Sequence, residues 1–199
     1  MDSANILLVL KPFIKVIDKL SISYYISGSL ASSAFGLPRS TMDIDIVVDL
    51  QSSHISQLKQ NLEGEFYIDE DMIKEAIDRL SSFNLIHLET AIKIDVFIHK
   101  RGSYQDSAFN RRQKDTLVEN DKSFEFYFSS PEDIILNKLQ WYEKGNRVSE
   151  RQWLDVLGVI KVQGDSLDKD YLINWAQKLD IYNLLGDVFT EAEVSLKNI

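Results

Sequence analysis

Cysteine is absent from this chain of 199 residues. Its absence excludes disulfide frameworks, zinc ribbons, thiol nucleophiles and dithiol redox chemistry. Histidine is scarce, and the three copies, His54, His87 and His99, lie far apart without the spacing of metal ligands. Neither a thiol nor a histidine cluster is therefore available for catalysis.

Long apolar runs are also missing, and none approaches the roughly eighteen residues that a membrane helix needs. Charged residues recur through the first twenty positions, so we expect neither a signal peptide nor a membrane anchor, and we expect a cytoplasmic protein. A hydrophobic fraction of 44% with 27% charged residues excludes a disordered chain. The net charge of −9 argues against a general nucleic-acid coat protein but leaves room for a local basic groove.

Apolar periodicity predicts an α+β fold, a mixed sheet with flanking helices followed by a helical C-terminal part. We expect a first domain over 1–128 and a second over 129–199, because only helical patterns follow Ser129. The expected strands are 22–26, 43–49, 65–68, 83–88, 92–99, 116–118 and 124–128. The expected helices are 7–20, 30–35, 52–62, 71–80, 131–143, 149–162, 168–179 and 183–197.

Three aspartates interrupt two of the expected strands, although aspartate is depleted in strands. Asp43 and Asp45 share one face of the strand over 43–49, because residues two apart point the same way. Asp95 lies opposite the apolar face of the strand over 92–99. If the two strands are neighbours, three carboxylates meet at one place. Such a cluster repels itself unless cations occupy it, and its hard oxygen ligands suit Mg²⁺ or Mn²⁺.

Gly28 and Ser29 follow an expected strand and begin a helix. A glycine there lets backbone N–H groups approach a phosphate, and the helix dipole favours negative charge. Thirteen residues separate Ser29 from Asp43, so a candidate phosphate cradle precedes a candidate metal site. This combination indicates nucleotide chemistry.

Gly28-Ser29, Asp43-Ile44-Asp45 and the apolar-flanked Asp95 together resemble the signature of polymerase-beta-like nucleotidyltransferases, over roughly residues 22–98. Within that superfamily, the segment 38–41 leading into Asp43 is similar to toxins of the AbiEii type. The segment 130–138, with Asp155 on the next helix, resembles the helical half of that group.

The resemblance implies transfer of NMP from an NTP to an acceptor hydroxyl, with release of pyrophosphate. It implies that Asp43 and Asp45 hold two Mg²⁺ ions (Mn²⁺ is the substitute), and that Asp95 shares one ion and acts as general base. The nucleotide-binding residues that it implies are Gly28, Ser29, Arg39, Thr41 and Lys138, with Asp155 as an additional candidate.

Three roles remain open at this level. The preferred one is a toxin-like enzyme, with or without a cognate antitoxin, that modifies RNA or protein; the first alternative is an enzyme that modifies a small molecule such as an aminoglycoside. The third is a catalytically idle nucleotide-binding or antitoxin-like interaction protein.

Five basic residues within Lys100–Lys114 are either a solvated loop or a patch for an anionic substrate. The identity of the NTP is not encoded in any motif.

Overall fold

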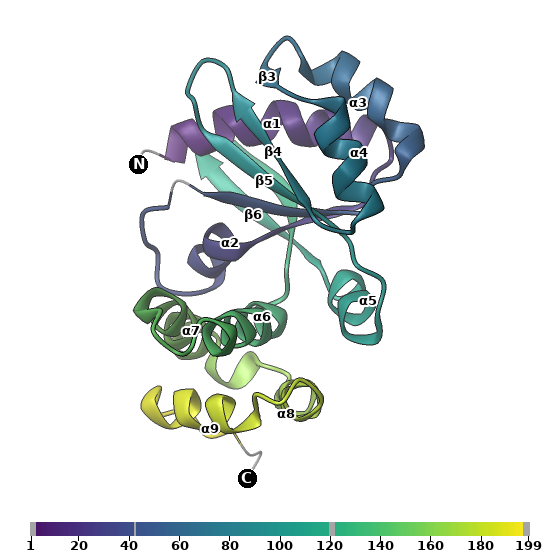
Figure 1. Ribbon diagram of the computed structural model, residues 1–199. Helices are drawn as coiled ribbons and strands as arrows, with labels where there is room; N and C mark the ends of the chain where they lie inside the picture. The colour runs from purple at the N-terminus through teal and green to yellow at the C-terminus, as the bar shows by residue number, and fades with distance from the viewer. Residues whose placement is uncertain (1–2, 42, 120–121, 197–199) are drawn as a thin grey trace. The chain divides into compact units, whose positions relative to one another are not determined.

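A computed structural model describes residues 3–41, 43–119 and 122–196 (Figure 1). The chain forms two compact units. The sheet unit comprises Met1–Ser27 and Ser40–Phe128, and the helical unit comprises Gly28–Arg39 and Ser129–Ile199. The segment Gly28–Arg39 therefore goes with the C-terminal helices, whereas the sequence places it within 1–128. The division of functions between 1–128 and 129–199 stays a prediction.

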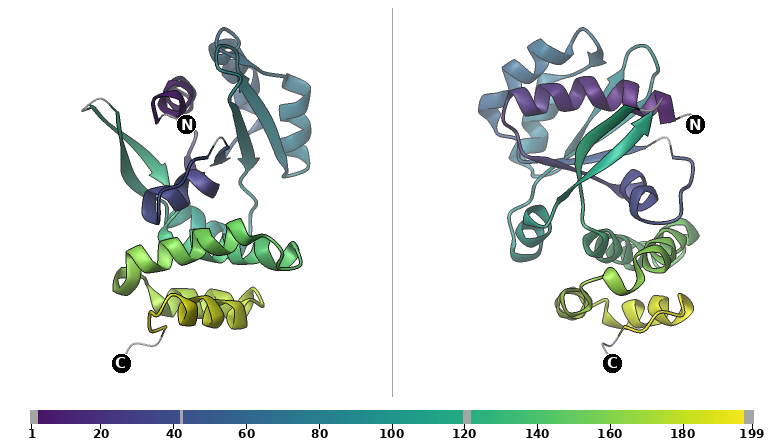
Figure 2. Two further views of the ribbon diagram at one scale, coloured as in Figure 1. Left: turned by 90° about the vertical axis from the view of Figure 1, so that its left-hand side faces the viewer. Right: turned by 180° about the vertical axis from the view of Figure 1, so that it is seen from behind.

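The sheet unit is built on a mixed sheet whose strands follow the order β3-β4-β5-β2-β1-β7-β6. The strands are β1 (Tyr24–Ser27), β2 (Ile44–Val48), β3 (Phe66–Tyr67), β4 (Ser82–His87), β5 (Lys93–Ile98), β6 (Gln113–Glu119) and β7 (Lys122–Phe128). Strands β2 and β5 are parallel neighbours, as are β1 and β7, and the other neighbours are antiparallel. The sheet is strongly twisted, with β6 and β7 splayed away from β4 and β5 (Figure 2, left). The predicted α+β class is confirmed.

One face of the central strands forms the core of the sheet unit. Ile44, Ile46 and Val48 of β2 are buried, as are Ile94, Val96 and Ile98, their partners on β5. The intervening side chains point to the opposite face, where Asp45 is paired in register with Asp95. The condition for a carboxylate cluster, that the two aspartate-bearing strands are neighbours, is therefore met.

The helices of the sheet unit are α1 (Ser3–Lys19), α3 (Ile55–Leu62), α4 (Glu70–Asp78) and α5 (Ser103–Asn110), with a 3₁₀ turn, η1, at Ser52–His54. Helix α5 was not expected from the sequence. It begins after Gly102, whose N–H donates to Asp106, and it buries Phe109 against Tyr25. Its apolar contacts come from distant strands, so local periodicity does not reveal it.

The helical unit contains α2 (Gly28–Phe35), α6 (Pro131–Lys144), α7 (Glu150–Gln163), η2 (Gly164–Ser166), α8 (Lys169–Lys178) and α9 (Tyr182–Glu191). Helix α9 ends before the predicted limit of 197, a residue that lies outside the described part of the chain. Two buried acids fix α8 to the start of α6. Asp133 accepts a hydrogen bond from the Tyr171 hydroxyl at 2.8 Å, and Glu132 accepts one from the Asp168 N–H at 2.9 Å. None of the described helices is both long and apolar enough to cross a membrane.

Helices α2 and α7 approach each other closely where glycines face the opposite backbone. A Cβ added to Gly36 would lie 2.8 Å from the Val159 nitrogen and 2.8 Å from the Ser32 carbonyl oxygen. A Cβ on Gly158 would lie 3.0 Å from the Leu37 nitrogen. Only residues without a side chain permit this contact.

We expect Gly36→Ala to lower the free energy of unfolding by about 1–3 kcal/mol, because overpacking has to separate two backbones. Urea unfolding followed by circular dichroism measures the change. Gly64→Ala is the matched control, since no atom lies within 4 Å of a Cβ at that exposed turn. Equal stability of the two variants would contradict the close packing of α2 on α7.

Candidate functional site

The sheet unit carries the three predicted carboxylates on two neighbouring strands. Asp43 directly precedes β2 and is exposed, whereas Asp45 on β2 and Asp95 on β5 are half-buried. The register sets Asp45 beside Asp95. Thr41 lies in the turn before β2, where its hydroxyl accepts a hydrogen bond from the Asp43 N–H at 3.3 Å. The Thr41 side chain is therefore engaged in shaping the entry to β2.

A lysine that the sequence analysis did not single out lies among these carboxylates. The Lys93 Nζ is 2.7 Å from Asp95 Oδ2. The hydrogen bond to Asp95, together with the charges of Asp43 and Asp45, raises the pKa of Lys93, so it is a cation at neutral pH. The signal for Lys93 was present in the sequence, because it lies two residues before Asp95 on the same strand face.

The carboxylates have the right chemistry for a magnesium site but are not assembled as one. Among residues 3–41, 43–119 and 122–196, no three acidic or histidine side chains are grouped closely enough to hold a metal ion. Asp45 and Asp95 still offer hard oxygen ligands from adjacent strand positions, as Mg²⁺ prefers. The donor set therefore fits the ion, with Asp95 turned onto Lys93 instead.

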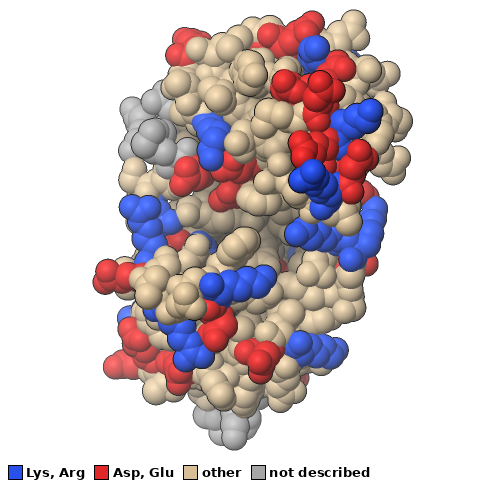
Figure 3. All heavy atoms as spheres, viewed as in Figure 1, with Lys and Arg blue, Asp and Glu red and all other residues tan. Residues whose placement is uncertain are grey.

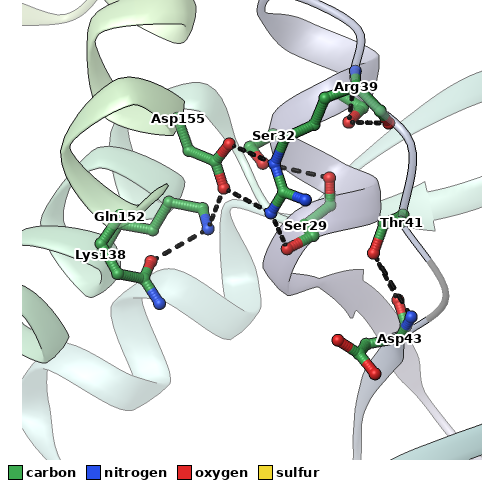
Figure 4. Close-up of polar contacts among 9 residues, drawn as sticks. Ser29, Ser32, Arg39, Thr41, Asp43, Lys138, Gln152 and Asp155 are labelled. Carbon is green, nitrogen blue, oxygen red and sulfur yellow. Dashed lines mark hydrogen bonds and ion pairs between the residues drawn. The ribbon is translucent and has the colours of Figure 1, made fainter. Parts of the chain in front are cut away.

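The helical unit brings together four of the predicted residues, Ser29, Arg39, Lys138 and Asp155 (Figure 4). Asp155 on α7 lies at the centre. Arg39 binds it in a bidentate manner, with Nε 2.7 Å from Oδ1 and Nη2 3.0 Å from Oδ2. Lys138 on α6 donates to Oδ2 at 2.7 Å and to the Gln152 side-chain oxygen at 3.1 Å.

Ser29 joins the same network at the start of α2. Its hydroxyl accepts a hydrogen bond from Arg39 Nη2, so the predicted phosphate-binding serine and arginine are in direct contact. Gly28, the residue before it, has a φ of 59°, a left-handed conformation that favours glycine. Two cations and a hydroxyl thus lie beside the first turn of a helix.

The charge state of this cluster follows from its surroundings. The side chains of Lys138 and Asp155 are 7% and 6% exposed. Burial alone would raise the pKa of Asp155, but hydrogen bonds from Arg39 and Lys138 outweigh it and lower the pKa. Asp155 is therefore ionised at neutral pH. Gln152, missed by the sequence analysis, lies three residues before Asp155 on α7 and offers no motif by which to find it.

Three of the five basic residues of Lys100–Lys114 have acidic or aromatic partners. Arg101 donates to Asp49 at 2.8 Å, and the Lys114 Nζ lies 3.5 Å from Glu125. Arg112 stacks over Phe109, with 4.8 Å to the ring centroid. On the face drawn in Figure 3, lysine and arginine side chains are interspersed with acidic ones. This segment, which contains α5, is therefore not a free basic loop.

Comparison with known structures identifies the fold. The solution structure of the antibiotic-resistance factor ANT(2'')-Ia matches with a TM-score of 0.53 and 14% identity, covering 97% of each chain. Its complex with adenylyl-2''-tobramycin matches at 0.52 and 13%, covering 91% of this chain and 96% of that one. The chain has the nucleotidyltransferase fold.

A nucleotidyltransferase-like protein from Paracoccidioides brasiliensis has the same fold, with a TM-score of 0.50 and 17% identity over 95% of this chain and 93% of that one. No protein-family model matches the sequence, and no curated protein does. The expected nucleotidyltransferase fold is confirmed, and the similarity to AbiEii-type toxins stays a prediction.

We expect Asp155→Asn to lower the free energy of unfolding at pH 7 by about 3 kcal/mol, because it leaves the buried Lys138 without its carboxylate. Because the pKa of Asp155 is lowered, its contribution is present above the ordinary pKa of an aspartate and is lost as the pH falls through the lowered value. Urea titrations at pH 7 and pH 3 should therefore show a smaller difference between variant and wild type at pH 3.

The control is Glu143→Gln, which removes the exposed ion pair between Glu143 in the last turn of α6 and Arg147 in the turn that follows. Its stability should stay near that of the wild type, since surface ion pairs contribute little. If Asp155→Asn behaves like this control at pH 7, the Lys138–Asp155 pair is not a structural interaction.

Proposed function

We propose that this protein is a nucleotidyltransferase that moves NMP from an NTP to an acceptor hydroxyl, using Mg²⁺, for which Mn²⁺ could substitute. The observation that carries the proposal is the in-register pair Asp45 and Asp95 on β2 and β5, in a chain with this fold. The cluster of Ser29, Arg39 and Lys138 in the helical unit supports it, because these groups recognise phosphate oxygens.

In this reaction, Asp43 and Asp45 would hold two Mg²⁺ ions, and Asp95 would share one of them. Bound ions supply charge stabilisation at the α-phosphate and the leaving pyrophosphate. Asp95 would accept the proton of the acceptor hydroxyl. The acceptor oxygen then forms a bond to the α-phosphorus, the bond from that phosphorus to the β-phosphate oxygen breaks, and pyrophosphate leaves.

The triphosphate would be held by the residues at the start of α2 and by the two cations beside them. Gly28 permits close approach of the backbone, and Ser29 offers a hydroxyl. Arg39 and Lys138 would supply positive charge, with Asp155 keeping both side chains in place. Thr41 would act on the nucleotide indirectly. Its hydroxyl accepts a hydrogen bond from the Asp43 N–H and so orders the turn before β2.

We expect Asp43→Asn and Asp45→Asn each to reduce NMP transfer at least about 100-fold, because each removes a charged ligand from a site whose function depends on cations. Pyrophosphate release is measured with each NTP in turn, with Mg²⁺ and with cell extract as the source of acceptors. Circular dichroism checks that the variants remain folded.

Asp49→Asn is the matched control, since Asp49 lies just beyond β2 and pairs with the exposed Arg101. It should retain transfer. Wild-type protein that releases no pyrophosphate with any NTP and any acceptor would favour the catalytically idle alternative. Full activity in Asp43→Asn and Asp45→Asn would contradict the assignment of the metal ligands.

For the acceptor, the observations favour a small cationic molecule over RNA. Among the five basic residues of Lys100–Lys114, the candidates for RNA binding, Arg101, Arg112 and Lys114 contact acidic or aromatic groups of the chain itself. The chain carries a net charge of −9, which attracts cations and repels a polyanion. ANT(2'')-Ia, which shares the fold, was solved with adenylyl-2''-tobramycin.

With labelled NTP and a mixture of cell RNA, protein and amino-sugar antibiotics, we expect the label in the small-molecule fraction. Labelling of the small-molecule fraction by Arg101→Ala should stay within about twofold of the wild-type level. The exposed ion pair of Arg101 contributes little to stability, and its positive charge does not attract a cationic acceptor. Label in RNA, falling steeply with rising salt as counterion release requires, would instead support the toxin role.

A further inference from the structure

Lys93 places a positive charge on the strand face that carries the proposed metal ligands. It lies two residues before Asp95 on β5, so the two side chains share a face. The Lys93 Nζ forms an ion pair with Asp95 Oδ2 at 2.7 Å. Asp45 pairs with Asp95 across the two strands, and the charges of Asp43 and Asp45 also act on the lysine.

We propose that Lys93 is a positioning residue. Its ammonium pairs with the Asp95 carboxylate when no metal ion is bound and releases that carboxylate when Mg²⁺ binds. The proposal rests on the metal role that the proposed function gives to Asp95. The contact between Lys93 and Asp95 occupies a carboxylate oxygen that the proposed function assigns to the ion.

The strength of the ion pair suits an exchange of partners. The Lys93 side chain is 44% exposed and that of Asp95 is 19% exposed, so water screens the attraction between them. Exposed ion pairs of this kind contribute little to stability. A divalent ion bound by several carboxylates can therefore displace the ammonium, while the lysine relieves their mutual repulsion in the absence of metal.

The lysine and the metal ion then compete for the same oxygen. Removal of the ammonium should strengthen metal binding, whereas loss of a ligand should weaken it. This opposite direction separates a competing cation from a residue that merely supports the strand. It also distinguishes Lys93 from Arg39 and Lys138, because substitution of those two residues would change the affinity for the nucleotide.

The test is a calorimetric titration of the full chain with Mn²⁺ in the absence of nucleotide. Lys93→Gln should bind Mn²⁺ roughly three- to tenfold more tightly than the wild type, as expected when a weak competing ion pair is removed. Lys93→Arg keeps the charge and should stay within about twofold of the wild type. Lys114→Gln, which removes another exposed lysine pair from the sheet unit, should leave the affinity unchanged.

A second readout locates the ion and does not depend on activity. Thermal unfolding in the presence of a chelator should show a lower Tm for Lys93→Gln than for the wild type, because the carboxylates then repel one another. Mn²⁺ should raise the Tm of Lys93→Gln by more than it raises the Tm of the wild type. Adding Asp45→Asn to Lys93→Gln should abolish the gain in affinity. A gain that survives Asp45→Asn would place the ion elsewhere and overturn the proposal.

Unchanged or weaker Mn²⁺ binding in a folded Lys93→Gln variant would also overturn it, as would the absence of Mn²⁺ binding in both proteins. These outcomes are distinguishable from failure of the proposed function, which pyrophosphate release measures. Active wild-type protein with unchanged metal affinity in Lys93→Gln would remove the role of Lys93 alone. Tighter Mn²⁺ binding without pyrophosphate release would remove the transferase proposal alone.

Discussion

The helical unit depends on the ion pairs that the buried carboxylate of Asp155 forms with two cations. Its two oxygens hold Arg39 from the segment after α2 and Lys138 from α6. A buried charge is tolerated only when it is paired and hydrogen-bonded, so each partner constrains the other two. The Gly28–Arg39 segment, far away in sequence, is thereby joined to α6 and α7. The Arg39 guanidinium also donates to the Ser29 hydroxyl, so one arginine connects the start of α2 to the same carboxylate.

The sheet unit solves a different electrostatic problem. Its carboxylates lie on the half-exposed face, where solvent screens them, and Lys93 supplies an internal counter-charge. The buried face of the same strands is wholly aliphatic at the positions that alternate with the aspartates. One strand pattern therefore builds a stable core on one side and a cluster of weakly held oxygen ligands on the other.

The local patterns of the sequence predicted much of this arrangement. Alternation in β2 and β5 was enough to place Asp45 and Asp95 on the polar face, and the serine cap of α6 marked its beginning. What local patterns could not predict were contacts between distant segments. Helix α5 depends on the packing of Phe109 against Tyr25, and α2 joins helices that begin a hundred residues later. The alternation of β5 already places Lys93 on the same face as Asp95, but their 2.7 Å contact depends on side-chain conformations that no local pattern predicts.

The way the chain is divided between its two units bears on its synthesis. The ribosome releases α2 long before α6 and α7, although Leu30, Ala31 and Phe35 of α2 are buried in the finished protein. Close packing at Gly36 and Gly158 can form only after α7 has emerged. Domains usually fold in order from the N-terminus during translation. Here the apolar side of α2 lacks its final neighbours until α7 has been synthesised, so the core of the helical unit cannot close in the order in which its helices are made.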